Sequence, residues 1–207
     1  MNSILKKINN LQKTPVSERV DQRIQEFKKK GNQPSEELFI ELCFCILTAN
    51  CSAESCLKTQ DKIGKDFLHL NKKELVKSLR VCGYRFPNIR ANYIINARPY
   101  ASILSENLFK LGHEQRRIWL IKHIKGIGYK EASHFLRNIG YDNYAIIDKH
   151  ILSLLADYHI IEKPKTMNKN NYLQIEKGLK EIAKQTNLSL AELDLYLWYM
   201  QTGKILK

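Results

Sequence analysis

The sequence predicts an all-α protein, and three features of the chain lead to this fold class. Apolar residues recur at helical spacing along most of the 207 residues, and alternating strand patterns of useful length are missing. Glycine and proline separate the helical stretches, as in the segment 82–88. Apolar residues make up 43% and charged residues 27% of the chain, which is ordinary for a globular protein and excludes a largely disordered or collagen-like one.

The first half of the chain contains two predicted helical segments with different character. Residues 4–30 are amphipathic and basic, with Ile4 and Ile8 at helical spacing. A polar break follows, in which Ser35 is expected to cap the next helix. That helix, residues 36–50, is apolar on nearly all sides and is therefore predicted to be central.

The second half repeats the helical pattern. The segment 88–105 places Ile89, Tyr93, Ile94 and Ala97 on one side. Further helices are expected over residues 116–123, 129–139, 149 onward, 172–183 and 189–200.

The charge of the chain points to a polyanionic partner. Lysine and arginine number 34 and aspartate and glutamate 21, which gives a net charge of +13. Nucleic acid is the first expected partner and an anionic membrane surface the second. The simplest alternative is a lysine-rich protein with neither partner. No run approaches the roughly 18 apolar residues of a membrane span. The first residues also lack the apolar core of a signal peptide, so a cytoplasmic protein is expected.

The five cysteines do not predict a metal site or a disulfide framework. Their number is odd and nothing indicates export, so structural disulfides are not expected. Cys43, Cys45, Cys51 and Cys56 are close in sequence, but they form no CxxC pair and no histidine lies beside them. We therefore interpret them as small buried hydrophobic residues.

The most informative stretch is residues 116–140, which predicts two helices joined by a tight turn. The turn carries Gly126 and Gly128 on either side of an apolar residue, and glycine permits a positive φ or a close backbone approach. The second helix begins near Tyr129 and should end at Gly140 as its C′ residue. This helix-hairpin-helix would aim backbone N–H groups at a phosphate without recognising sequence, although a plain αα-hairpin has the same outline.

Lys130 and Asp148 stand out beside this hairpin. Lys130 lies in the first turn of the second helix, where the positive end of the helix dipole favours a neutral, nucleophilic amine. A surface lysine that contacts phosphate is the simpler interpretation. Asp148 precedes a further helix and fits an N-cap, worth about 1 kcal/mol. It also fits a carboxylate that deprotonates the lysine and stabilises positive charge on a sugar, and the two roles are compatible.

The hairpin with Lys130 and the aspartate eighteen positions later resemble the helix-hairpin-helix DNA glycosylase superfamily. Residues 46–50, 131–138 and 193–199 are further similar to the type 2 8-oxoguanine DNA glycosylases found mainly in archaea. The resemblance extends from about residue 16 to Lys207.

This resemblance implies a two-lobed all-α enzyme of base excision repair with its active site in the cleft between the lobes. One lobe would be residues 32–141, and the other residues 1–31 together with 142–207. The enzyme would excise 8-oxoguanine from duplex DNA and nick the abasic strand by β-elimination. Lys130 would form an imine with C1′, assisted by Asp148, with no metal or organic cofactor. Its partner would be duplex DNA containing 8-oxoguanine or abasic sites, met by a monomer at the nucleoid of a prokaryotic cell.

The resemblance also suggests residues that handle the flipped nucleotide. Phe86 would act as the wedge and Arg85 would probe the orphaned base, although Phe86 also fits a core aromatic. Asn50 would enter the vacated stack or merely cap its helix. The carboxylate on Lys207 would accept the N7 proton that distinguishes 8-oxoguanine from guanine. Trp198 would stack on the base or lie in the core, and Gly126 and Gly128 would bind the backbone.

Differences between this sequence and other members of the superfamily narrow the range of expected cofactors and activities. No cysteine follows Cys82, so the iron–sulfur cluster of some relatives is excluded. Three other functions remain as competitors. They are excision of another oxidised base such as an oxidised pyrimidine, a non-catalytic helix-hairpin-helix DNA-binding module, and a membrane-surface protein, which the N-terminal helix disfavours because it lacks aromatic anchors.

Overall fold

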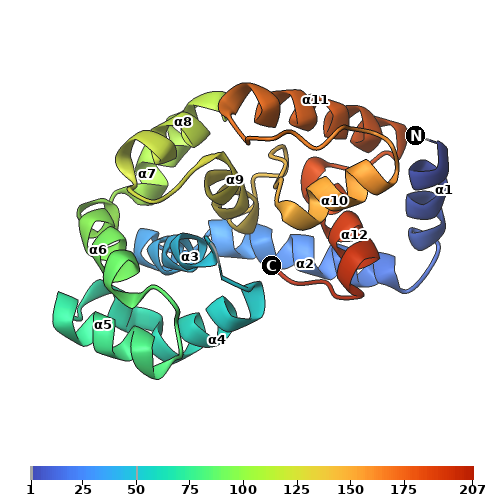
Figure 1. Ribbon diagram of the computed structural model, residues 1–207. Helices are drawn as coiled ribbons and strands as arrows, with labels where there is room; N and C mark the ends of the chain where they lie inside the picture. Colours follow the sequence, from blue (N-terminus) through green and yellow to red (C-terminus); the bar gives the residue numbers. More distant parts are fainter. Residues whose placement is uncertain (1, 50) are drawn as a thin grey trace. The chain divides into compact units, whose positions relative to one another are not determined.

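The computed structural model describes residues 2–49 and 51–207, and over these residues it is helical without strands (Figure 1). The predicted all-α class is confirmed. The α-helices are α1 Asn2–Leu11, α2 Val16–Gly31, α3 Ser35–Thr48, α4 Ala53–Ile63, α5 Lys72–Val81, α6 Pro87–Ala97, α7 Leu104–Phe109, α8 His113–His123, α9 Tyr129–Asn138, α10 Lys149–Asp157, α11 Lys169–Gln185 and α12 Leu190–Thr202. Two short 3-10 helices, η1 Gly64–Leu68 and η2 Arg98–Tyr100, complete the list.

The chain divides into two compact units. Unit 1 comprises Met1–Lys29 and Gly140–Lys207, and unit 2 comprises Lys30–Ile139. The sequence places the corresponding boundaries after residues 31 and 141. Unit 2 is therefore one continuous stretch, whereas unit 1 draws on both ends of the sequence.

Helix α3 forms the centre of unit 2, as its apolar composition predicts. All of its residues from Leu38 to Thr48 are buried, and it packs against α4, α6, α7 and α9. The prediction that Ser35 caps this helix is wrong. Pro34 occupies the N-cap position without a side-chain hydrogen bond, and the Ser35 hydroxyl instead accepts from the backbone N–H of Ser105, 3.1 Å away in the first turn of α7.

The core of unit 1 joins α2 to α12. Apolar residues of the two helices form one buried cluster with Ile205 beyond α12. Its members are Val16, Val20, Ile24, Phe27, Ala191, Leu195, Tyr196 and Ile205. The predicted helical segment 4–30 is in fact two helices, because Pro15 lacks an N–H and disfavours a helical residue before it.

The cysteines are all free thiols. Cys43, Cys45 and Cys56 are buried, as expected for small hydrophobic residues, whereas Cys51 and Cys82 are half-buried. Burial raises the pKa of the Cys43 thiol well above its ordinary value. Among the described residues, no group of three or more His, Cys, Asp or Glu side chains is arranged to hold a metal ion.

None of the described helices is long and apolar enough to cross a membrane.

Candidate active site

The turn between α8 and α9 uses its two glycines in different ways. Gly126 has a φ of +87°, and a Cβ there would lie 2.2 Å from the Tyr93 ring, so any side chain would clash. Gly128 has an ordinary φ of −106°. A Cβ at Gly128 would meet only the Glu131 carboxylate, at 3.4 Å. The fold requires glycine at position 126, but the packing of the chain itself does not require it at 128.

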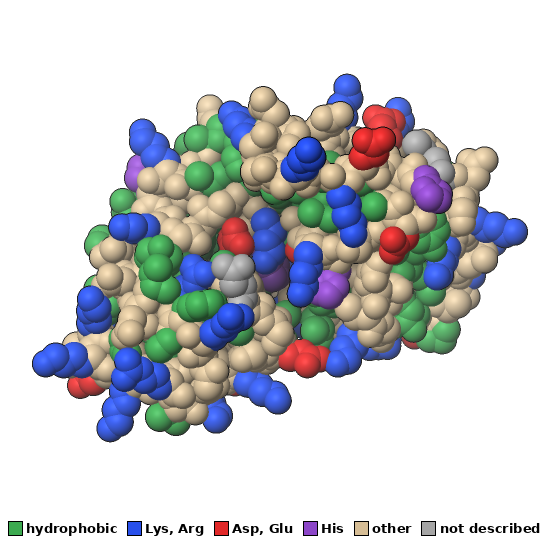
Figure 2. Space-filling model, in the orientation of Figure 1, with side chains coloured by type: hydrophobic (Ala, Val, Ile, Leu, Met, Phe, Trp, Pro, Cys, Tyr) green, Lys and Arg blue, Asp and Glu red, His purple; other side chains and the backbone are tan. Residues whose placement is uncertain are grey.

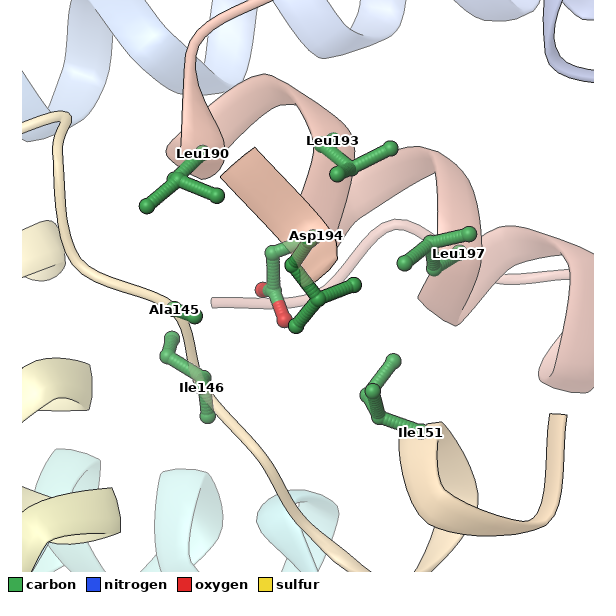
Figure 3. Close-up of a pocket in the computed structure, with 8 residues that line it drawn as sticks. Ala145, Ile146, Ile151, Leu190, Leu193, Asp194 and Leu197 are labelled. Carbon is green, nitrogen blue, oxygen red and sulfur yellow. The ribbon is translucent and has the colours of Figure 1, made fainter. Parts of the chain in front are cut away.

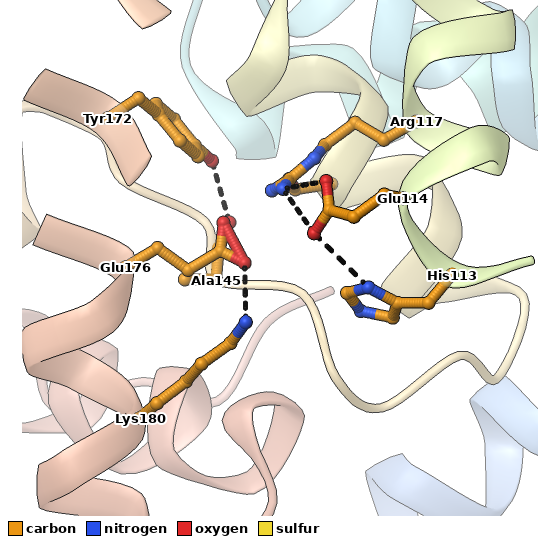
Figure 4. Close-up of polar contacts among 8 residues, drawn as sticks. His113, Glu114, Arg117, Ala145, Tyr172, Glu176 and Lys180 are labelled. Atoms are coloured by element: carbon orange, nitrogen blue, oxygen red, sulfur yellow. Dashed lines mark hydrogen bonds and ion pairs between the residues drawn. The ribbon is translucent and has the colours of Figure 1, made fainter. Parts of the chain in front are cut away.

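A buried arginine joins the two helices of the hairpin (Figure 4). Arg117 of α8 is fully buried, and its guanidinium lies 3.0 Å from Glu114 and 3.4 Å from the Ser133 hydroxyl of α9. The same guanidinium lies 5.1 Å from the centre of the Tyr129 ring, at the start of α9. Arg117 was not predicted from the sequence, because arginine in a basic amphipathic helix is normally exposed.

Lys130 is the second residue of α9, and its side chain is 26% exposed. Its Nζ atom lies 3.6 Å from Oε1 of Glu131. The other oxygen of that carboxylate accepts from the backbone N–H of Gly128 at 3.2 Å. The sequence predicted the position of Lys130 in the first turn of the helix but not its ion-pair partner Glu131.

The far end of α9 is fixed by a carboxylate inside the apolar helix α3. Glu41 is 1% exposed and accepts from Asn138 Nδ2 at 2.6 Å and from Gln60 Nε2 at 3.1 Å. Hydrogen bonds to a buried charge are among the stronger ones in proteins. Glu41 was not identified from the sequence, although a single carboxylate within the apolar stretch 38–48 was a usable signal.

Asp148 lies in unit 1 and is the N-cap of α10, as predicted. One of its carboxylate oxygens accepts from the backbone N–H groups of His150 and Ile151, each at 2.9 Å. Both donors belong to the first turn of the helix, whose dipole also stabilises an anion there. The side chain is therefore held as a fixed carboxylate.

The segment before Asp148 is anchored by Tyr172 of α11 (Figure 4). This tyrosine is 1% exposed, and its hydroxyl donates to the Ala145 carbonyl at 2.6 Å. The same hydroxyl accepts from the backbone N–H of Ile147 at 3.4 Å, immediately before Asp148. Sequence analysis did not identify Tyr172, because its partners are about 25 residues away along the chain.

Trp198 lies beside the first turn of α10. Its half-buried ring contacts the His150 ring edge to face, with centroids 5.1 Å apart. The indole N–H is buried without a hydrogen-bond partner. Lys207 is half-buried, and Ile205 two residues earlier packs into the core of unit 1. The Trp198 side chain is thus only partly buried, whereas the alternative given from the sequence was a core residue.

A small pocket in the same unit offers little to a base (Figure 3). Its walls are aliphatic apart from Asp194, whereas recognition of a base needs several placed hydrogen-bonding groups. The lining residues are Ala145, Ile146, Ile151, Leu179, Leu190, Leu193, Asp194 and Leu197.

In unit 2, the predicted wedge lies in the loop before α6. Arg85 is exposed and Phe86 is half-buried, so Phe86 is not a core aromatic. The Arg85 guanidinium lies 5.0 Å from the centre of the Phe86 ring. Asn50, the other predicted intruding residue, lies outside the described residues.

The fold and the glycine-dependent turn between α8 and α9 define this chain as a helix-hairpin-helix protein. Comparison with known proteins makes this more specific. Residues 20–188 match the family model of 8-oxoguanine DNA glycosylase. The chain belongs to this family.

Relatives and solved structures agree with the family match. The 8-oxoguanine DNA glycosylase/AP lyase of Methanocaldococcus jannaschii is 49% identical over 205 residues, covering 99% of both chains. Its crystal structure with a 15mer DNA containing 8-oxoguanine superposes with a TM-score of 0.96, at 48% identity over 99% of this chain and 100% of that one. The 8-oxoguanine DNA glycosylase of Thermotoga maritima gives a TM-score of 0.94 at 43% identity, over the full length of both chains.

Proposed function

We propose that the protein excises 8-oxoguanine from duplex DNA and then cleaves the abasic strand by β-elimination. Full-length similarity to 8-oxoguanine DNA glycosylase/AP lyases carries this proposal, at 49% and 45% identity to the relatives from Methanocaldococcus jannaschii and Korarchaeum cryptofilum. The positive surface supports it: lysine and arginine side chains are spread over the face in Figure 2, with few acidic ones among them. DNA binding of this kind weakens steeply with salt.

Lys130 is the proposed nucleophile. After losing a proton, its Nζ attacks C1′ of the flipped nucleotide, and the bond from C1′ to the base breaks with its electron pair leaving on the base. The nitrogen loses its remaining proton and forms a double bond to C1′ while the C1′–O4′ bond breaks, and O4′ takes up a proton as the sugar ring opens. The imine makes a C2′ proton acidic, and loss of that proton expels the 3′ phosphate. The ion pair with Glu131 must be given up before the amine attacks.

Asp148 is the proposed carboxylate partner. Its two hydrogen bonds from the first turn of α10, each 2.9 Å long, fix its position. A fixed anion stabilises the positive charge that develops on the sugar as the base leaves, and it serves as the proton acceptor for the amine.

Base recognition is assigned to Trp198 and Lys207. The half-buried indole of Trp198 offers a face for stacking, and its N–H is a buried donor without a partner in the unbound protein. The terminal carboxylate of Lys207 is the proposed acceptor for the N7 proton, a contact that guanine cannot make. Ile205 supports this role because it anchors the segment two residues earlier.

The DNA duplex is handled by unit 2 in this proposal. The hairpin with Gly126 and Gly128 holds the phosphate backbone, Phe86 wedges into the stack, and Arg85 and Asn50 meet the bases left behind. We assign the protein to the nucleoid in the cytoplasm of a prokaryotic cell, where it would act as a monomer without a cofactor.

The decisive experiment is borohydride trapping on duplexes carrying 8-oxoguanine, thymine glycol, an abasic site or no lesion. A covalent adduct with the 8-oxoguanine duplex is expected for the natural sequence, and none for Lys130→Gln. Lys125→Gln is the matched control, because it removes the same charge from the exposed turn and should still form the adduct. An adduct with thymine glycol but not 8-oxoguanine would shift the specificity to oxidised pyrimidines. No adduct with any duplex would leave a DNA-binding module.

A further inference from the structure

We infer that Arg90 is a positioning residue that fixes the loop carrying Arg85 and Phe86 against the end of α3 and the hairpin turn. The inference rests on the proposed function, because it concerns how the DNA-intruding loop of that enzyme is held in place. It is carried by two contacts of the buried Arg90 side chain and by one contact of Tyr84.

The first contact joins α6 to the end of α3. Arg90 is 7% exposed, and its Nη2 atom donates to the Ala49 carbonyl at 2.8 Å. Ala49 is the C-cap residue of α3. A guanidinium at this position satisfies a carbonyl that the helix cannot pair and complements the negative end of the helix dipole.

The second contact fixes the other end of the same loop. The hydroxyl of Tyr84, which is 4% exposed, donates to the Leu47 carbonyl in the last turn of α3. Burial raises the pKa of Tyr84, and the nearby Arg90 lowers it in part, so the phenol remains a donor. Tyr84 and Arg90 thus flank Arg85 and Phe86, and both donate to carbonyls at the end of α3.

The third contact extends to the hairpin. The Arg90 guanidinium lies 5.5 Å from the centre of the Tyr93 ring, one turn further along α6. The Tyr93 ring lies so close to Gly126 that a Cβ there would be 2.2 Å from it. A continuous line of contacts therefore runs from the hairpin turn through Tyr93 and Arg90 to the end of α3.

The proposed reaction requires the loop that carries Phe86 to keep its position. An aromatic wedge must hold its position while the target base leaves the stack, which costs free energy. Phe86 lies in a short loop, and without the contacts of Tyr84 and Arg90 on either side of it this loop could shift when the base leaves the stack. Lysine could not replace Arg90, because one ammonium cannot pair with a carbonyl and also present a planar face to an aromatic ring.

The test compares Arg90→Lys with Arg98→Lys. Arg98 is a matched control in the same unit, since it also donates to two backbone carbonyls, those of Phe67 at 2.8 Å and Leu70 at 2.6 Å. Each variant is assayed in single turnover on 8-oxoguanine paired with cytosine and on 8-oxoguanine opposite an abasic site. The second duplex has no partner base to displace. Stopped-flow fluorescence of 2-aminopurine beside the lesion follows base extrusion, and thermal unfolding follows stability.

Arg90→Lys should slow excision from the paired duplex on the order of 10- to 100-fold, the loss typical of a misplaced group. It should reduce the extrusion signal in parallel and change the rate on the unpaired lesion by less than about threefold. Arg98→Lys should change both rates by the same factor. Tyr84→Phe, a milder second variant, should shift the ratio in the same direction as Arg90→Lys.

Equal losses on both duplexes, or a rate on the paired duplex within twofold of the natural sequence, would overturn the inference. If Arg90→Lys unfolds at the assay temperature, Tyr84→Phe decides, and an unchanged ratio then contradicts the inference. A natural-sequence protein that forms no imine with 8-oxoguanine would instead refute the proposed function, whatever Arg90 does.

Discussion

Helices α9 and α10 each begin at a residue proposed to take part in the reaction, but the two helices start differently. The N-cap of α9 is Gly128, which has no side chain to cap the first turn. The N-cap of α10 is Asp148, whose own carboxylate accepts two N–H groups of that turn. The N-cap residue of α9 supplies no anion, and the one carboxylate in its first turn, Glu131, already contacts the Gly128 N–H and Lys130, whereas the N-cap residue of α10 is itself an anion.

This difference shows that the positive end of a helix dipole can serve two purposes. The positive end of a helix attracts an anion, and the sequence decides whether that anion is a ligand or a residue. At α9 the proposed anion is a DNA phosphate, which would lie beside the ion pair of Lys130 and Glu131. At α10 the anion is Asp148 itself, and the helix holds it ready.

The largest effect on this difference between α9 and α10 is expected from Asp148→Asn, which removes the anion at the start of α10. Asparagine caps a helix about as well as aspartate, so the free energy of unfolding should change by less than about 0.5 kcal/mol. The rate of imine formation should fall about 10²- to 10⁴-fold, because the charge and the proton acceptor are lost. Ser189→Ala at the N-cap of α12 is the control, expected to cost about 1 kcal/mol of stability without slowing the chemistry. A variant within tenfold of the natural rate would contradict the role of Asp148.

Substitutions at the two hairpin glycines should affect different properties. A change at Gly126 should lower stability, and a change at Gly128 should weaken DNA binding. Gly126→Ala should destabilise the protein by about 1–3 kcal/mol or more, since its Cβ clashes with Tyr93 at a positive φ. Gly128→Ala should leave stability within about 0.5 kcal/mol and weaken duplex binding several-fold, because the added methyl group faces the proposed phosphate. Urea unfolding and DNA titrations at two salt concentrations measure the two effects. Equal destabilisation by both changes would remove the distinction.

Tyr172→Phe tests whether Asp148 needs a fixed backbone, because it removes the hydrogen bonds that hold only the segment before Asp148. Loss of the hydroxyl leaves a buried carbonyl unpaired, which should cost about 1–3 kcal/mol of stability. We expect kcat to fall while the Kd for abasic DNA stays the same, because the DNA contacts are assigned to unit 2. Tyr158→Phe at the other end of α10 is the matched control. A change in Kd without a change in kcat would point to a different role for Tyr172.

The smallest effect is expected from Glu131→Gln. Glutamine keeps the capping interaction with the Gly128 N–H but removes the charge opposite Lys130. An ion pair near the surface is worth about 0.2–1 kcal/mol, so borohydride trapping at neutral pH should become about 1.4- to 5-fold faster. A slower reaction would show that Glu131 takes part in the chemistry rather than holding the ammonium.

The sequence predicted what depends on local patterns. The helical class, the buried α3, the hairpin, the Asp148 cap and the end of α9 before Gly140 all follow from spacing and from residues with special backbone preferences. The break at Pro15 was also visible locally and was missed.

The buried polar residues could not be predicted in this way. Glu41 bonds to Asn138, 97 residues away, and Arg90 to Ala49, 41 residues away. Composition and periodicity treat such residues as exposed, because burial of a charge depends on partners brought together only by the tertiary fold.

The core that joins α2 to α12 has a consequence for the order of folding. Val16, Val20 and Ile24 are made early during synthesis, whereas Leu195 and Ile205, which cover them, are made last. Contacts between such distant residues form slowly, while the continuous unit 2 needs no later residues for its own core. On the ribosome, unit 2 should therefore fold first. The apolar face of α2 then remains uncovered until α12 has left the exit tunnel, which makes the emerging chain vulnerable to aggregation and proteolysis.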